Sequence, residues 1–217
     1  MTTPTSPPSA SRLWELARRP AAQPAEVVGE RCDLCAEPVP AEHRHLLDTA
    51  SGGAALCACR ACALLFDRQE AGGQHYRLLP RRRLRLDGFA VDDLLWASLG
   101  VPVGLAYFVR ESATGQTAVG YPSPLGSTRS TVEPSVWQEL SGGHPALTDL
   151  ADDVEALLVH RAKGAREHWI VPLDDCYRLV AVVRTHWKGL AGGPEVWDRI
   201  ERFFTELAHS AQVPGYP

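Results

Sequence analysis

The sequence predicts an α+β fold in which a small cysteine-rich module precedes an antiparallel-sheet domain with packed helices. Two Cys-x-x-Cys pairs, at positions 32/35 and 59/62, define the module. Short β-branched runs separated by polar connectors between positions 103 and 184 are typical of an antiparallel sheet. Near the end of the sequence, apolar residues recur at helical spacing and predict a helix that must pack on another element.

The composition divides the chain into three segments. Residues 1–25 are rich in Pro, Ser and Thr at their start, which predicts a disordered N-terminal tail and linker. Residues 26–80 contain both cysteine pairs and are predicted to form the module, and residues 86–211 are predicted to form the α+β domain. The basic stretch Arg81–Arg83 between them indicates either a solvated linker or a docking site for an acidic partner.

Local patterns predict the elements of the larger domain. Helices are expected at residues 91–99 and 136–140, and β-branched enrichment predicts strands at 103–109, 117–121, 154–160, 168–173 and 177–184. Asp174-Asp175 is then interpreted as a turn between the last two strands. The final helix begins at Pro194, where the missing N–H costs nothing. It presents one wide apolar face, formed by Val196, Trp197, Ile200, Phe203, Phe204 and Leu207.

The cysteine pairs predict a metal site. Cys32 and Cys35 are separated from Cys59 and Cys62 by 23 residues, and a hairpin turning at residues 51–53 can close this gap. Two such knuckles supply the four sulfurs that Zn²⁺ accepts in closed structural sites. So small a segment buries too little apolar surface to fold unaided, so metal binding would supply the missing free energy. The sequence therefore predicts a four-cysteine zinc-knuckle module in front of the α+β domain.

Two alternatives to this assignment remain open. In an extended strand Cys57 would share a face with Cys59, so Cys57 could substitute for it as a ligand. His45 is a second possible substitute, although His43 and His45 are also typical of a solvated loop. Iron is the alternative metal, since four thiolates also suit a single iron or an iron–sulfur cluster. Rubredoxin-like knuckles usually place Gly after their cysteines and Pro inside the second pair, and this sequence has neither.

A second constellation of chemical groups spans Glu167 to Gly193. Cys176 with His186 as base could form a nucleophilic pair, but a strand position beside two aspartates disfavours a thiolate. Gly192-Gly193 at the start of a helix, aided by Lys188, could bind an anion. The remaining hypothesis is a partner-binding face, because aromatic and Arg side chains are effective interface anchors. Its candidate residues are Trp169, Arg184, His186, Trp187 and Lys188, and the alternative is that both tryptophans belong to the core.

Bulk properties narrow the class of protein. A net charge of −4 argues against general nucleic-acid binding, which needs a basic surface. No segment approaches the ~18–20 apolar residues that span a bilayer, so no membrane span is expected. The first residues lack a secretory signal pattern, which predicts a reducing compartment. In such a compartment the six cysteines are expected to be metal ligands or buried thiols, not disulfides. We therefore expect a cytoplasmic protein.

Several strings resemble one known family. These are ERCDLC, EHRHLLD, LCACRACALLFD, YRLLP, EHWIVPLDDCYRLV and RTHWKGLAGG, within residues 30–208. Together they resemble an uncharacterised bacterial family encoded beside the genes of high-affinity [NiFe] hydrogenases. The resemblance implies a non-enzymatic accessory protein of hydrogenase maturation or assembly, with a hydrogenase subunit or assembly factor as partner. It provides no catalytic residues. The alternatives are an electron-transfer protein with iron at the four cysteines, or an enzyme using the Asp174–His186 region.

Overall fold

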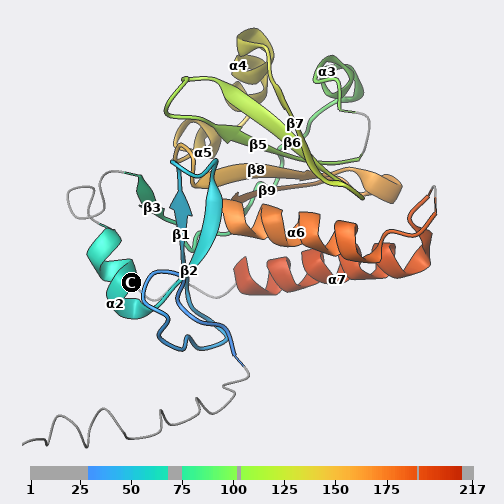
Figure 1. Ribbon diagram of the computed structural model, residues 1–217. Coiled ribbons are helices and arrows are strands. Elements are labelled where there is room, and N and C mark those ends of the chain that lie inside the picture. The colour runs from blue at the N-terminus through green and yellow to red at the C-terminus, as the bar shows by residue number, and fades with distance from the viewer. Residues whose placement is uncertain (1–28, 68–74, 102–103, 190, 212–217) are drawn as a thin grey trace, which may run out of the picture.

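The computed structural model describes residues 29–67, 75–101, 104–189 and 191–211. Within these ranges the chain forms two antiparallel sheets and a set of helices (Figure 1). The predicted α+β class is therefore confirmed. The tail and linker predicted for residues 1–25 lie outside the described residues. Among the described helices, none combines the length and the apolar character needed to cross a membrane.

The cysteine-rich segment has its own three-stranded sheet, of order β2-β1-β3. Its strands are β1 (Arg44–Asp48), β2 (Ala54–Ala58) and β3 (Tyr76–Leu78), and helix α2 (Arg60–Phe66) follows β2. The β1–β2 turn falls where the sequence placed it. Gly52 and Gly53 there adopt φ of 73° and 81°, a left-handed conformation that side-chain-bearing residues rarely adopt. The Asp48 carboxylate accepts a hydrogen bond from the N–H of Ala50 at 3.0 Å and closes the turn.

The larger sheet has six strands in the order β4-β9-β8-β5-β6-β7, and each neighbouring pair is antiparallel. Its strands are β4 (Leu84–Arg85), β5 (Leu105–Arg110), β6 (Thr117–Ser123), β7 (Gly126–Thr131), β8 (Glu155–His160) and β9 (Glu167–Pro172). The helices are α3 (Asp93–Ser98), α4 (Pro134–Gly142), α5 (Pro145–Thr148), α6 (Leu173–His186) and α7 (Gly193–Ala211), with a 3-10 turn η1 (Ala162–Gly164).

The sheet is covered on both faces. Alternate residues of a strand point to opposite faces, so β5 sends Tyr107 to one core and Phe108 to the other. Helices α6 and α7 cover the first face, and α3, α4 and α5 cover the second (Figure 1). The predicted apolar face of α7 is buried through Val196, Ile200, Phe203, Phe204 and Leu207. Burial of each such side chain stabilises the fold by ~1.5–3 kcal/mol.

The strand predicted at residues 177–184 is wrong, because this segment belongs to helix α6. Leu173, Cys176, Leu179 and Val183 are the buried apolar positions, at helical spacing. Asp174 and Asp175 are not a turn but the first turn of this helix, where carboxylates interact favourably with the helix dipole. Strand β7 was missed because almost all of its residues are exposed and polar, which leaves no alternating apolar signal.

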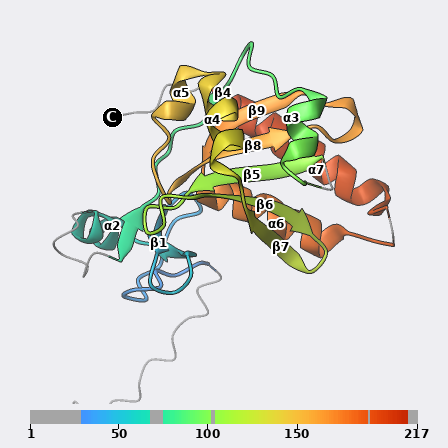
Figure 2. The same cartoon turned by 90° about the horizontal axis from the view of Figure 1, so that it is seen from above.

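The basic stretch lies between β3 and β4 and is anchored to the larger domain by ion pairs. Arg82 donates through Nε and Nη2 to both Glu155 oxygens at 2.9 and 2.8 Å, and Arg83 binds Asp175 likewise at 2.6 and 3.1 Å. Glu155 and Asp175 are only 4% and 3% exposed. Arg82 and Arg83 therefore neutralise buried carboxylates of their own chain, and the expectation of a solvated linker or partner-docking segment is wrong for them. Both views place the module beside one end of the larger sheet (Figures 1 and 2).

Candidate metal centre

The first cysteine pair lies on a tight turn. An isolated bridge pairs Arg31 with Pro38, and the Cys32 N–H donates to the Glu37 carbonyl at 2.8 Å. The turn closes when the Ala36 N–H donates to the Cys32 carbonyl at 2.8 Å, with Ala36 in the left-handed region at φ 61°. This backbone path brings Cys32 and Cys35 to one side of the turn, as a metal knuckle requires.

The second pair lies at the start of a helix. Cys59 caps α2, and its Sγ accepts a hydrogen bond from the N–H of Cys62 at 3.4 Å. Cys62 is buried one turn further along the helix. The two knuckles are joined because the Asp33 N–H donates to the Cys57 carbonyl at 2.9 Å, and the Cys57 N–H donates to Asp33 Oδ2 at 2.6 Å. The helix start and the turn are thus held face to face.

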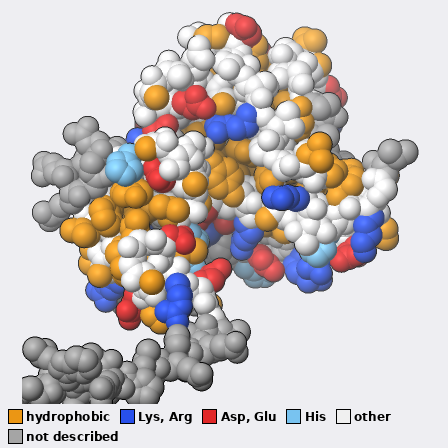
Figure 3. Space-filling model, viewed as in Figure 1, with side chains coloured by type: hydrophobic (Ala, Val, Ile, Leu, Met, Phe, Trp, Pro, Cys, Tyr) orange, Lys and Arg blue, Asp and Glu red, His pale blue; other side chains and the backbone are white. Residues whose placement is uncertain are grey.

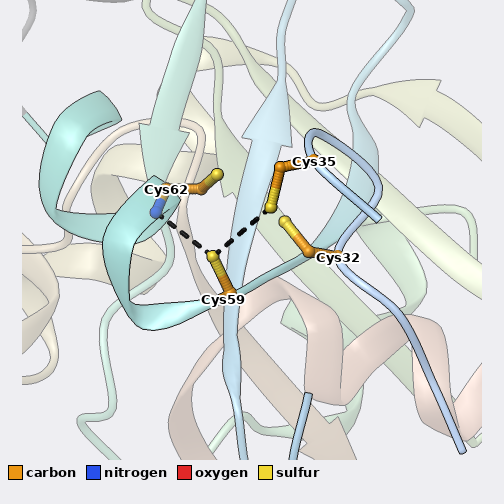
Figure 4. Close-up of side chains that lie close together, drawn as sticks. All are labelled: Cys32, Cys35, Cys59 and Cys62. Carbon is orange, nitrogen blue, oxygen red and sulfur yellow. Dashed lines mark hydrogen bonds between the residues drawn. The ribbon is translucent and has the colours of Figure 1, made fainter. Parts of the chain in front are cut away.

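The four sulfurs of Cys32, Cys35, Cys59 and Cys62, here called the four-cysteine cluster, converge on one point (Figure 4). Their Sγ atoms all lie within 4.8 Å of one another, and those of Cys35 and Cys59 are 3.7 Å apart. Tetrahedral zinc–thiolate bonds of about 2.3 Å place the sulfurs about 3.8 Å apart, so the observed spacing fits such an ion. Cys32 and Cys62 are buried, whereas Cys35 is exposed. These four cysteines could therefore hold a metal ion.

The thiols of Cys32, Cys35 and Cys62 have different pKa values, because each one that ionises disfavours ionisation of its neighbours. Burial opposes ionisation of Cys32, but hydrogen bonds from the backbone N–H groups of Cys59, Leu34 and Cys35 outweigh it, so the pKa falls to about 6. Burial and then the neighbouring thiols raise the pKa of Cys62. A backbone hydrogen bond from Glu37 lowers the pKa of Cys35, but the thiols of Cys32 and Cys59 reverse this effect. A bound divalent cation would remove the conflict, because coordinated thiols are deprotonated.

Cys57 and His45, expected as possible substitute ligands, lie in a separate group with His43. One donor atom of each lies within 4.8 Å of the others. The His43 side chain is only 4% exposed, and its Nε2 has no hydrogen-bonding partner among the described residues. Such an orphaned buried atom costs ~1–3 kcal/mol. The interpretation of His43 as a solvated loop histidine is therefore wrong, and the His43-x-His45 spacing and the hairpin turn together contained the signal for this group.

The predicted partner-binding face is largely occupied by internal contacts. Trp169 is 1% exposed and belongs to the core, so its assignment to a docking surface is wrong. Trp187 packs against the same core from the end of α6. His186 Nδ1 and Lys188 Nζ both approach the Glu195 carboxylate, at 3.1 and 2.7 Å. Arg184 is exposed, and no hydrogen bond or ion pair joins its side chain to the described residues.

The two other chemical readings of this region also fail. Cys176 is fully buried in the first turn of α6, not at the start of a strand. Burial, and then Asp175 and Asp174, raise the pKa of this thiol well above its ordinary value. His186 lies ten residues further along the same helix, about 15 Å away at 1.5 Å per residue. At the start of α7, where an anion site was one candidate, Lys188 is paired instead with the Glu195 carboxylate of the same helix turn, at 2.7 Å.

Fold and site together define an α+β protein with an N-terminal cluster of four cysteines able to hold a metal ion. The chain belongs to DUF5947, a family of unknown function, whose model matches residues 31–211. The match spans the cysteine module and the larger sheet together, and it confirms the resemblance to an uncharacterised family. Comparisons with curated proteins and with solved structures found no match.

Proposed function

We propose that the protein is a non-enzymatic, zinc-binding accessory protein of [NiFe]-hydrogenase maturation or assembly, which acts in the cytoplasm by binding another protein. The observation that carries the structural part is the convergence of Cys32, Cys35, Cys59 and Cys62. Four protein thiolates complete a tetrahedral shell and leave no position for substrate, which is the mark of a structural site. The zinc would hold α2 against the first knuckle. The hydrogenase context rests on the family resemblance alone.

A protein-binding role is supported by the surface of α2. Leu64 and Leu65 lie on the same helix as Cys62, two and three residues after it, and are 65% and 56% exposed. Apolar side chains gather over this part of the module in the space-filling view (Figure 3). Adjacent exposed leucines on a short helix are costly to leave in water and suit an apolar patch on a partner. Zinc at Cys62 would fix the helix that presents them, which links the metal site to the proposed binding role.

Metal content tests the structural part. We expect the purified protein to contain zinc and to show no visible absorbance. Cys62→Ser should lose the zinc of the four-cysteine cluster and destabilise the module, because the free energy of metal binding contributes directly to the folding of so small a segment. The matched control is Cys176→Ala, a buried cysteine outside the cluster, which should retain its metal. Elemental analysis and absorption spectra decide the outcome. Stoichiometric iron with strong visible bands would instead favour the electron carrier, for which the exposed Cys35 offers a route to the surface.

Binding tests the functional part. Affinity for purified hydrogenase subunits and assembly factors can be measured for the wild type and for Leu64→Asp and Leu65→Asp. We expect each change to weaken binding to one of these partners by about 2 kcal/mol, as for a truncated interface anchor. Leu94→Asp and Leu125→Asp are matched controls, since these leucines are 83% and 97% exposed, in α3 and in the turn between β6 and β7. Equal affinities for all four variants would remove α2 as the docking surface, and no binding by the wild type would remove the hydrogenase role.

A further inference from the structure

The β1–β2 hairpin creates a second group of metal-ligating side chains beside the four-cysteine cluster. His45 on β1 is paired directly with Cys57 on β2. His43 lies immediately before β1, two residues ahead of His45. One ring nitrogen of each histidine and the Cys57 sulfur all lie within 4.8 Å of one another. These residues come from the start and the end of the hairpin, so only the folded register brings them together.

Both histidines are oriented as metal ligands usually are. His43 Nδ1 lies 2.9 Å from the Pro40 carbonyl oxygen, which can only accept a hydrogen bond, so Nδ1 carries the proton. His45 Nδ1 lies 2.7 Å from Asp174 Oδ2, at the first turn of α6. In metal sites the non-ligating ring nitrogen typically donates to a carbonyl or carboxylate, which fixes the ring and its tautomer. The nitrogen left for a metal in each ring is therefore Nε2.

The environment of His43 provides an independent observation. Its side chain is only 4% exposed, and its Nε2 is buried with no hydrogen-bonding partner among the described residues. With the proton on Nδ1, a neutral ring has its lone pair on Nε2. A buried lone pair without a donor is rare in folded proteins and calls for an explanation, such as an ion. A metal ion between the two rings and Cys57 would use this lone pair.

We propose that His43, His45 and Cys57 form a second zinc site, separate from the four-cysteine cluster. Two imidazoles and one thiolate are a donor set that Zn²⁺ accepts, and three protein ligands leave one coordination position for water or another small ligand. His45 is 30% exposed at its side chain, so that position can be reached from solvent. Asp174 acts as a positioning residue for His45 and links this site to the larger domain. The proposal does not depend on the hydrogenase role or on the metal in the four-cysteine cluster.

The test is zinc stoichiometry after equilibrium dialysis of the full chain against buffered free Zn²⁺. The wild type is expected to bind two zinc ions, and His43→Ala and Cys57→Ser one each. His209→Ala and Cys176→Ala are matched controls outside both clusters and should bind two. Asp174→Ala should retain both zinc ions at saturation but weaken the second by about 10–100-fold, the usual effect of losing the partner that orients a ligand.

Substitution by Co²⁺ provides a second readout. The visible bands of the wild type should contain a contribution that His43→Ala and Cys57→Ser both remove, while the tetrathiolate bands remain. Cys57 is half-buried and its change to Ser is small, so this variant keeps the test available if His43→Ala does not fold. Equal zinc contents in the wild type and in both variants would overturn the second site. Cys62→Ser reports on the four-cysteine cluster alone, whereas His43→Ala and Cys57→Ser report on the second site. The two proposals can therefore fail independently of each other.

Discussion

The Arg83–Asp175 ion pair tests how the connector between β3 and β4 is held on the larger domain. The Asp175 side chain is 5% exposed, and the guanidinium of Arg83 binds both of its oxygens. Arg83→Ala leaves this carboxylate buried without its main partner, a loss that costs ~3–5 kcal/mol in buried pairs. Arg178 lies 3.4 Å from the same carboxylate and compensates in part. We therefore expect the free energy of unfolding to fall by about 3 kcal/mol, the lower end of that range.

Urea denaturation followed by circular dichroism measures this change. The matched control is Arg129→Ala, which breaks an exposed pair with Glu111 and should cost no more than ~1 kcal/mol. The double variant Arg83→Met/Asp175→Leu removes both charges and should recover most of the loss, since apolar replacements of a buried pair are often neutral. If Arg83→Ala costs no more than Arg129→Ala, the pair does not stabilise the attachment of this connector to α6, and the reasoning is refuted.

Three further predictions concern the larger domain. Burial, and then Arg161 and Arg166, lower the pKa of His168 to about 4. The stabilising contribution of the neutral imidazole should therefore be fully present above the ordinary pKa of 6.5, and the free energy of unfolding should fall by about 3 kcal/mol as the pH drops towards 4. His168→Phe should flatten this part of a pH series of unfolding free energies. Gly192→Ala should lower the melting temperature more than Gly189→Ala, because both have positive φ but only at Gly192 would a Cβ meet side chains, at 2.9 Å from Val196 Cγ1. Trp187→Ala should lower the melting temperature whereas Arg184→Glu should not, because Trp187 packs against the core. Equal melting temperatures for the two variants would contradict the assignment of Trp187 to the core.

Sequence patterns predicted the elements that show a wide apolar helix face or an uninterrupted apolar run. The apolar face of α7 repeats over several turns, and the hairpin of β8 and β9 combines apolar runs with a turn at Gly164, so both were found. Helix α6 was missed because Val180, Val182 and Val183 have the composition of a strand, and only the spacing of its buried residues reveals the helix. Local propensity was outweighed there by packing against the sheet and α7.

The candidate sites were predictable to different degrees. The four-cysteine cluster follows from two local knuckles, each readable from a Cys-x-x-Cys spacing, so all of its cysteines were identified. The second group depends on the register of a hairpin, since a slip of one residue would turn His45 or Cys57 to the other face. The pairing of Arg82 and Arg83 with buried carboxylates joins residues more than 70 positions apart, and no local pattern encodes such contacts.

The first turn of α6 explains why the module and the larger domain form one unit. Carboxylates at a helix N-terminus interact favourably with the helix dipole, and α6 has two of them, Asp174 and Asp175. The same two side chains bind His45 and Arg83, while Tyr177 one turn further donates to the Gly53 carbonyl at 3.0 Å. The start of α6 therefore orients the hairpin that contains the second group of ligands. It follows that removing the Asp174 carboxylate would weaken both the proposed metal site and the contact between β1 and α6.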